Sequence, residues 1–129
     1  MTKNAHILVV DDEESMREFL SIMLKREGYG VNVASDGAQA LELLKENSYD
    51  LIISDIQMPR LGGFELLAQV MARTPETAMI MITAFSSTEQ AVEAMKQGAY
   101  DYITKPFKNE EIRLIVKNAL ERKTLRQEN

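Results

Sequence analysis

Residues 6–12 read HILVVDD, a short apolar run that ends in the two carboxylates Asp11 and Asp12. A run of this length is typical of a strand that is covered on both faces, as strands of a parallel sheet are. Three further apolar runs stop close to a polar residue: residues 51–54 before Asp55, residues 79–82 before Thr83 and residues 100–103 before Lys105. The chain therefore carries three carboxylates and a lysine where strands are predicted to end.

Helical patterns lie between the apolar runs. Apolar residues recur at i, i+3, i+4 and i+7 in Met16, Phe19, Leu20 and Met23, and this predicts a helix with one buried stripe that ends at Gly28. A second strand is predicted at residues 31–34, and further helices at residues 39–45, 64–71, from about Ser87 to Gly98, and around residues 112–119. Five alternations of strand and helix predict an α/β fold of the flavodoxin-like (βα)5 type, a doubly wound parallel sheet.

The composition of the strands predicts their order in the sheet. The first, third and fourth runs are nearly continuous, whereas the second alternates with Asn32 and the fifth with Asp101, which suits strands at the edges. The order 2-1-3-4-5 follows. It places the first and third strands side by side at the point where the strand order reverses, which is where open α/β sheets bind ligands.

In that order, Asp11, Asp12 and Asp55 converge at one edge of the sheet. Two unit charges about 5 Å apart repel by roughly 3 kcal/mol at an effective dielectric constant near 20. A bound divalent cation and the ammonium group of Lys105 would relieve this repulsion. Carboxylate oxygens favour a hard cation such as Mg²⁺, which keeps several of its waters.

Each of these residues also has an ordinary interpretation. Asp11 or Asp12 could cap a helix, Asp55 could be a turn residue, and a lysine is most often a surface residue. Their combination at the ends of strands favours a reaction site instead. Asp55 would be a carboxylate nucleophile that accepts a phosphoryl group. Lys105, whose backbone is restrained by Pro106, would direct its ammonium group at that phosphoryl group. The Thr83 hydroxyl would hydrogen-bond the phosphoryl group, and the small Ala84 would leave a path to Asp55.

The ordered set Asp11-Asp12, Asp55, Thr83-Ala84 and Lys105-Pro106-Phe107 resembles the receiver domain of two-component response regulators, the CheY-like superfamily. The resemblance covers nearly the whole chain. It implies that a sensor histidine kinase donates a phosphoryl group to Asp55. It also implies that Asp12, Asp55 and the backbone carbonyl of Gln57 bind Mg²⁺, with Asp11 acting through a water molecule.

The same resemblance implies a switch. Thr83 and Lys105 would contact the phosphoryl group, Tyr102 would be the aromatic residue that turns inward when Thr83 moves, and the Lys105–Pro106 peptide bond would be cis. Gly62 departs from the family pattern, which often has an acidic residue there. That difference affects the loop and leaves the site residues in place.

Output is predicted to pass through the fourth helix, fifth strand and last helix, as a phosphorylation-dependent homodimer or as contact with a covalent output domain or effector protein. The inward stripe of the fourth helix, Ala91, Ala94 and Met95, is thin, so that helix should be the least firmly docked. We predict a receiver domain over residues 1–121. Residues 122–129 are either the start of a linker helix or a frayed end.

The chain as a whole most resembles the receivers of transcriptional activators that work with the alternative sigma factor. A stand-alone relay or chemotaxis-type receiver is the alternative. A Mg²⁺-dependent aspartyl-phosphate hydrolase would need a second aspartate as general acid two residues after Asp55, where this chain has Gln57. A flavodoxin would need a hydroxyl- and glycine-rich loop after the first strand, where residues 11–14 are all acidic. We therefore predict a phosphoacceptor without an external turnover substrate.

The composition narrows the classes of partner. The chain has 129 residues, a net charge of −5, 45% hydrophobic residues and no cysteine. This length fits one domain, and the absence of a broad basic field argues against direct binding of nucleic acid by this segment. The short N-terminal apolar run is not a membrane span. A cytoplasmic location without membrane contact is the expectation.

Overall fold

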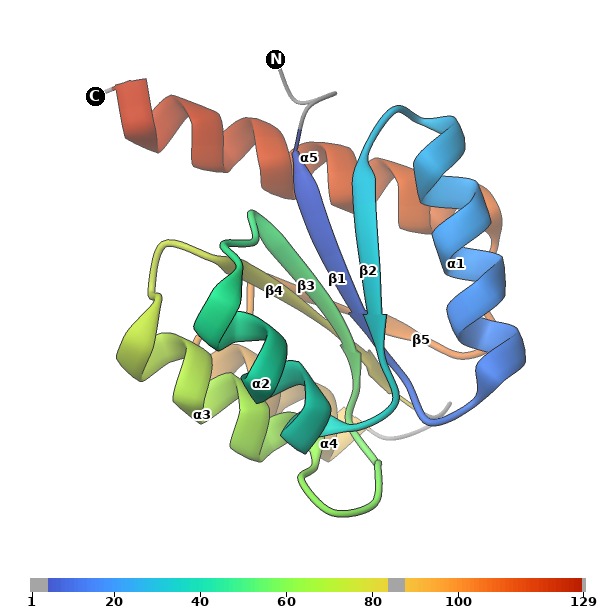
Figure 1. The fold of residues 1–129 in the computed structure, drawn as a ribbon, viewed down its shortest axis with the longest axis vertical. Helices are drawn as coiled ribbons and strands as arrows, with labels where there is room; N and C mark the ends of the chain where they lie inside the picture. The colour runs from blue at the N-terminus through green and yellow to red at the C-terminus, as the bar shows by residue number, and fades with distance from the viewer. Residues whose placement is uncertain (1–4, 84–87, 129) are drawn as a thin grey trace.

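The structure is a computed structural model that describes residues 5–83 and 88–128, with the side chains of residues 5–83 and 88–121. Strands and helices alternate along the whole chain (Figure 1). The elements are β1 (His6–Val10), α1 (Glu14–Arg26), β2 (Gly30–Ala34), α2 (Gly37–Glu46), β3 (Leu51–Asp55), α3 (Gly63–Arg73), β4 (Ala78–Thr83), α4 (Thr88–Lys96), β5 (Asp101–Thr104) and α5 (Asn109–Glu128). The predicted alternation is confirmed.

The five strands form one parallel sheet in the order β2-β1-β3-β4-β5. This is the predicted order, with β2 and β5 at the edges. Edge strands are covered less completely, and Val33 on β2 and Tyr102 on β5 are accordingly 41% and 38% exposed. The carboxyl ends of all five strands lie at the same edge of the sheet, so residues that follow different strands can meet there.

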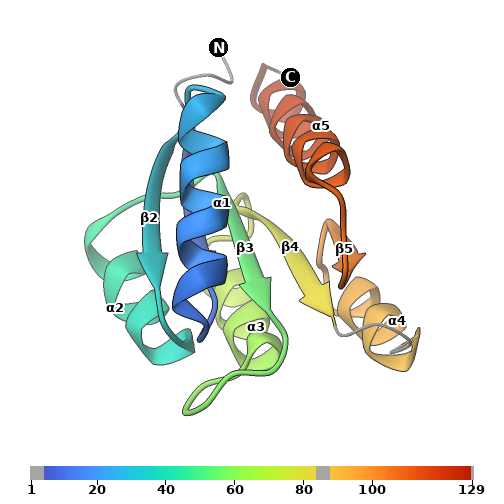
Figure 2. The same cartoon turned by 90° about the vertical axis from the view of Figure 1, so that its right-hand side faces the viewer.

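Helices cover both faces of the sheet (Figures 1 and 2). On one face, Leu20 and Leu24 of α1 and Ile112 and Val116 of α5 pack against strand residues such as Ile53. On the other face, helices α2, α3 and α4 contribute buried side chains to a second cluster with Leu8, Ile52 and Met79. Successive strand residues point to opposite faces, which is why the continuous apolar runs supply both cores.

Helix α1 differs from the prediction in the stripe that it buries. Phe19, which we predicted to face the core, is 38% exposed, while Leu20 and Leu24 are fully buried. Leu20 and Leu24 are four positions apart and define the side of the helix that faces the sheet. Successive residues of a helix are rotated by about 100°, so Phe19 points away from that side. The end of α1 agrees with the prediction: Gly28 has φ 96°, and the amides of Gly28 and Tyr29 bond back to Lys25 and Leu24, a Schellman cap.

Helix α4 is anchored by alanines, as predicted. Ala91 and Ala94 are buried, but Met95, which we predicted to face inward, is 43% exposed and Val92 is 49% exposed. Ala94 faces the sheet, so its neighbour Met95 is rotated toward the outside. The buried apolar area of this helix is therefore even smaller than the sequence indicated.

Helix α5 continues to Glu128, so residues 122–128 have a helical backbone; their side chains lie outside the described set. In the described part of the chain, no helix combines the length and the apolar character needed to cross a membrane.

Candidate phosphoacceptor and metal site

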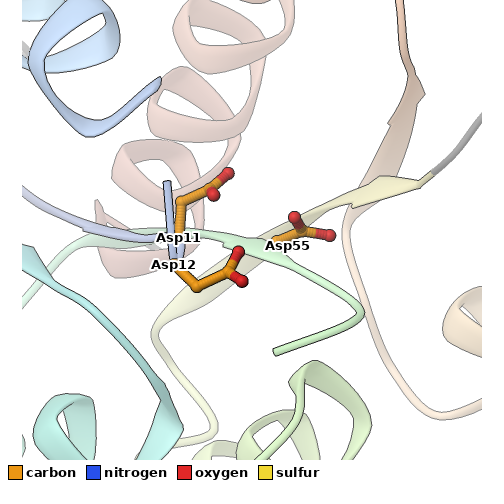
Figure 3. Close-up of side chains that lie close together, drawn as sticks. All are labelled: Asp11, Asp12 and Asp55. Carbon is orange, nitrogen blue, oxygen red and sulfur yellow. The ribbon is translucent and has the colours of Figure 1, made fainter. Parts of the chain in front are cut away.

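Three carboxylates converge at the edge where the strands end (Figure 3). Asp11 follows β1 directly and Asp55 is the last residue of β3; these strands are neighbours, with Val10 paired to Ser54. One carboxylate oxygen from each of Asp11, Asp12 and Asp55 lies within 4.8 Å of the other two. The adjacency of β1 and β3 thus brings together carboxylates that lie more than forty positions apart in the chain.

Asp11 is the most buried member of this cluster. It is 0% exposed; its Oδ1 accepts a hydrogen bond from the Glu13 amide at 2.9 Å, while no donor among the described residues reaches its Oδ2. Burial raises the pKa of Asp11 to about 6, and the nearby charge of Asp55 adds to this rise. A buried carboxylate oxygen without a partner is costly, and a divalent cation would offset that cost. The donor set fits an oxygen-ligated metal ion.

Asp55 is held between a cation and an amide. The Lys105 Nζ atom lies 3.2 Å from Asp55 Oδ2, and the Gln57 amide donates to Asp55 Oδ1 at 3.2 Å. Burial lowers the pKa of Lys105, but the charge and the hydrogen bond of Asp55 outweigh it, so that the pKa lies above its ordinary value. Lys105 therefore remains an ammonium ion at neutral pH and partly balances the three carboxylates.

Thr83 ends β4 beside Asp55. It is buried, and its backbone carbonyl accepts a hydrogen bond from the Lys105 amide at 2.9 Å. The strand pairing places Thr83 opposite Thr104 of β5, one residue before Lys105. Ala84, predicted as a contact of the phosphoryl group, lies outside the described residues.

Two further expectations concern β5 and the turn after it. The side chain of Tyr102 is 38% exposed and so is not enclosed by the core. The peptide bond between Lys105 and Pro106 is cis, the isomer that the family resemblance implied.

The segment between β3 and α3, residues 56–62, carries Gln57 past the carboxylates. The Gly63 amide donates to the Ile56 carbonyl at 2.8 Å, and the Gly62 amide donates to Glu65 Oε1 at 3.0 Å. Glycine at position 62 thus occupies the N-cap of α3, with Glu65 closing the first turn from within the helix. The departure of Gly62 from the family pattern leaves the site carboxylates in position.

Three residues near the site were not singled out from the sequence. Arg17 donates from Nη1 to the carbonyl of Asp11 at 2.8 Å. Asp36 caps α2, and Arg60 pairs with it through Nη2 and Oδ2 at 2.7 Å. The sequence Asp36-Gly37 before a helix is a recognisable N-cap signal. Nothing local indicated Arg60 as its partner, because 24 positions separate the two residues.

Comparison with known proteins agrees with this geometry. The family model described as "Response regulator receiver domain" matches residues 7–117. The chain is 37% identical over 128 residues to "Regulatory protein AtoC" of Escherichia coli (strain K12). The aligned region covers 99% of this chain and 28% of AtoC. It is 40% identical over 114 residues to "Transcriptional regulatory protein ZraR" of Klebsiella oxytoca, covering 88% of this chain and 26% of the relative. The chain therefore spans about a quarter of the length of these relatives.

Solved structures show the same fold. The crystal structure of NtrX from Brucella abortus superposes with a TM-score of 0.92 at 37% identity, over 97% of this chain and 29% of that one. A receiver domain protein from Clostridium thermocellum has a TM-score of 0.88 at 35% identity and matches 94% of this chain and 98% of its own. The flavodoxin-like topology, the converging carboxylates and these similarities lead to one conclusion. The chain belongs to the response regulator receiver domain family of two-component signalling systems.

Proposed function

We propose that Asp55 is the phosphoacceptor of this receiver domain and that a sensor histidine kinase supplies the phosphoryl group. The observation that carries this proposal is the position of Asp55, 3.2 Å from the Lys105 ammonium and within 4.8 Å of the carboxylates of Asp11 and Asp12. An Asp55 oxygen forms a bond to phosphorus while the bond from phosphorus to the kinase histidine nitrogen breaks. The electron pair of that bond returns to the nitrogen, and the ring, which carries a proton on its other nitrogen, leaves as neutral imidazole. The product is an acyl phosphate on Asp55.

Mg²⁺ is the cation that we propose for the cluster. Asp12, Asp55 and the backbone carbonyl of Gln57 would hold it, and Asp11 would act through a water molecule. Bound there, it supplies positive charge that lets an anionic phosphoryl group approach an anionic carboxylate. The oxygen-only donor set supports this assignment, as does the buried Asp11 Oδ2, to which no residue in the described ranges donates a hydrogen bond.

The remaining site residues bind and report the phosphoryl group. We propose that Lys105 moves its ammonium group from Asp55 to a phosphoryl oxygen, that the Thr83 hydroxyl donates to another, and that Ala84 leaves room for the group to enter. Lys105 and Thr83 are suited to move together, because the Lys105 amide is hydrogen-bonded to the Thr83 carbonyl at 2.9 Å.

The switch that follows involves α4, β5 and α5. Movement of Thr83 would open space into which Tyr102, which is 38% exposed in the structure, turns inward. Helix α4 is anchored by two alanines and presents Val92 and Met95 to the outside, so it can shift at low cost and offers apolar contacts. We propose that this face forms a homodimer or contacts an output domain when Asp55 is phosphorylated.

The output is proposed to be transcriptional. The match covers only 26% of the relative named "Transcriptional regulatory protein ZraR", so that relative is more than three times as long as the chain. This fits a receiver that controls a covalently attached output domain, as in an activator that works with the alternative sigma factor. We propose a cytoplasmic location, where a transcriptional regulator would act. A stand-alone relay protein would share the same site chemistry and lack the attached domain.

Labelling with a small acyl-phosphate donor tests the proposal. With Mg²⁺ present, the unmodified protein should gain the mass of one phosphoryl group, and Asp55→Asn should not. Asp101→Asn is the matched control, because Asp101 starts β5 at the other end of the strand from Lys105. Undiminished labelling of Asp55→Asn, or loss of labelling in Asp101→Asn alone, would rule out Asp55 as the acceptor.

A further inference from the structure

The loop that carries Gln57 lies against the start of α2, an element with no part in the proposed phosphoryl chemistry. The Gly37 amide donates to the carbonyl of Leu61 at 2.9 Å. The approach is so close that a Cβ atom at position 37 would overlap that carbonyl oxygen. The backbone of residues 57–62, which we call the metal loop, is therefore seated directly on the first residue of α2.

An ion pair reinforces this seat. Arg60 donates from Nε to Asp36 Oδ2 at 2.8 Å, and its Nη2 lies 2.7 Å from the same oxygen. The other Asp36 oxygen accepts the Gln39 amide at 2.8 Å and caps α2. One buried carboxylate thus joins the helix to the loop. The hydrogen bond from the Gln39 amide, together with the hydrogen bond and positive charge of Arg60, keeps the pKa of Asp36 below its usual range. Asp36 therefore remains ionised at neutral pH.

Arg60 is held in a backbone conformation that does not suit an arginine. Its φ is 69°, and it is the one non-glycine residue with a positive φ in residues 5–83 and 88–128. Glycine would adopt this left-handed conformation without strain. An arginine in its place is consistent with a role for the side chain, and its guanidinium group is hydrogen-bonded to Asp36.

We propose that Asp36 and Arg60 are positioning residues for the metal site. By tying the metal loop to α2, the pair holds the Gln57 backbone next to Asp55, to which the Gln57 amide is bonded at 3.2 Å. This inference rests on the proposed function, because it assumes that the Gln57 carbonyl binds Mg²⁺. Neither Asp36 nor Arg60 touches the ion in this arrangement. They act by restricting the loop that carries one ligand, so that less freedom is lost when the ion binds.

A double-mutant cycle on Mg²⁺ affinity tests the proposal. Asp36→Asn keeps an N-cap side chain and removes the charge. Arg60→Gly removes the guanidinium and fits the left-handed backbone, so a strained fold cannot explain its effect. Outer residues that orient metal ligands typically change metal affinity about 10- to 100-fold. Because this pair acts through the loop, we expect each variant to weaken Mg²⁺ binding by about three- to tenfold, and the double variant to weaken it no further.

The matched control is Glu42→Gln, which breaks the Glu42–Lys45 ion pair on α2 at a distance from the metal loop. Its Mg²⁺ dissociation constant should equal that of the unmodified protein. Calorimetric titration gives the affinities, and denaturant unfolding without Mg²⁺ is measured in parallel. Arg60→Lys should retain part of the Mg²⁺ affinity that Arg60→Gly loses, because lysine keeps the positive charge but lacks the planar two-donor contact of arginine.

The outcomes separate the two proposals. Unmodified protein that fails to bind Mg²⁺ would overturn the proposed function itself. Unmodified protein that binds Mg²⁺, together with Asp36→Asn and Arg60→Gly variants of unchanged affinity, would overturn the positioning role alone. So would losses of affinity in the two single variants that add fully in the double variant, because the residues would then act independently.

Discussion

The Nζ atom of Lys105 lies 3.2 Å from Oδ2 of Asp55, although the two residues are 50 positions apart in the chain. Asp55 ends β3 and Lys105 follows β5, with β4 between them in the sheet. The side chain of Lys105 spans this separation, and its amide is anchored to Thr83 of the intervening strand. The backbone of Lys105 is therefore anchored so that its ammonium group lies beside the acidic cluster.

Replacing Lys105 with methionine should destabilise the protein when no divalent cation is present. The Asp55 carboxylate would lose a part-buried charged hydrogen bond, so we expect the free energy of unfolding to fall by about 1 to 2 kcal/mol. Because a positive charge has been removed beside the site, Mg²⁺ should bind more tightly and restore much of the loss. Urea unfolding with and without Mg²⁺ measures both effects. An equal loss under both conditions would contradict the prediction.

Replacing Asp11 with asparagine should stabilise the metal-free protein at neutral pH. Burial is the main reason that the pKa of Asp11 is raised from 3.8 to about 6, so its ionised form costs up to about 3 kcal/mol in the folded state. Since folding raises this pKa, the cost is absent below about pH 4, grows as the pH rises, and is complete above about pH 6. Urea midpoints of both proteins across pH 4–8 should therefore diverge with rising pH. A constant difference would show that charge is not the cause.

Replacing Thr83 with alanine should leave labelling of Asp55 intact and weaken the phosphorylation-dependent association. The hydroxyl is the group that we propose links the phosphoryl group to Tyr102. Sedimentation of the labelled proteins should show a dimer dissociation constant raised about tenfold or more, roughly 1.4 kcal/mol. Ser48→Ala is the control, because it removes an exposed hydroxyl group between α2 and β3 and leaves the residues of α4, β5 and α5 unchanged. Unchanged association of Thr83→Ala would exclude this route.

Replacing Gly63 with alanine should destabilise the fold, against the helix propensity of alanine. A Cβ atom at position 63 would lie 2.5 Å from the Asp55 carbonyl oxygen and 2.8 Å from the Ile56 Cα, both of which are backbone atoms. We expect a loss of about 1 to 3 kcal/mol and weaker labelling of Asp55, because the strand end must shift. Gly62→Ala is the control, since its nearest neighbour would be 3.4 Å away. Thermal unfolding of the two variants makes the comparison, and equal stability would show that the turn adapts freely.

The sequence by itself determined the strands, their order and the gathering of the acidic residues. Each of these depends on local information: whether an apolar run is continuous or interrupted, as at Asn32, and which residue follows it, as Asp11 follows Val10. Parallel pairing then places strand ends at a common edge whatever the details of packing. Asp11, Asp12 and Asp55 could therefore be assigned to one site before any contact between them was known.

Only the tertiary structure decided how the helices are rotated and how the metal loop is held. Phe19 and Met95 belong to periodic apolar patterns that fit more than one rotation of a helix, and packing against the sheet chose the rotation that leaves them exposed. The pair Asp36–Arg60 depends on a left-handed backbone at Arg60 and on the contact of Gly37 with Leu61. Such contacts join segments that carry no local sign of each other, because their free energy exists only once both segments are in place.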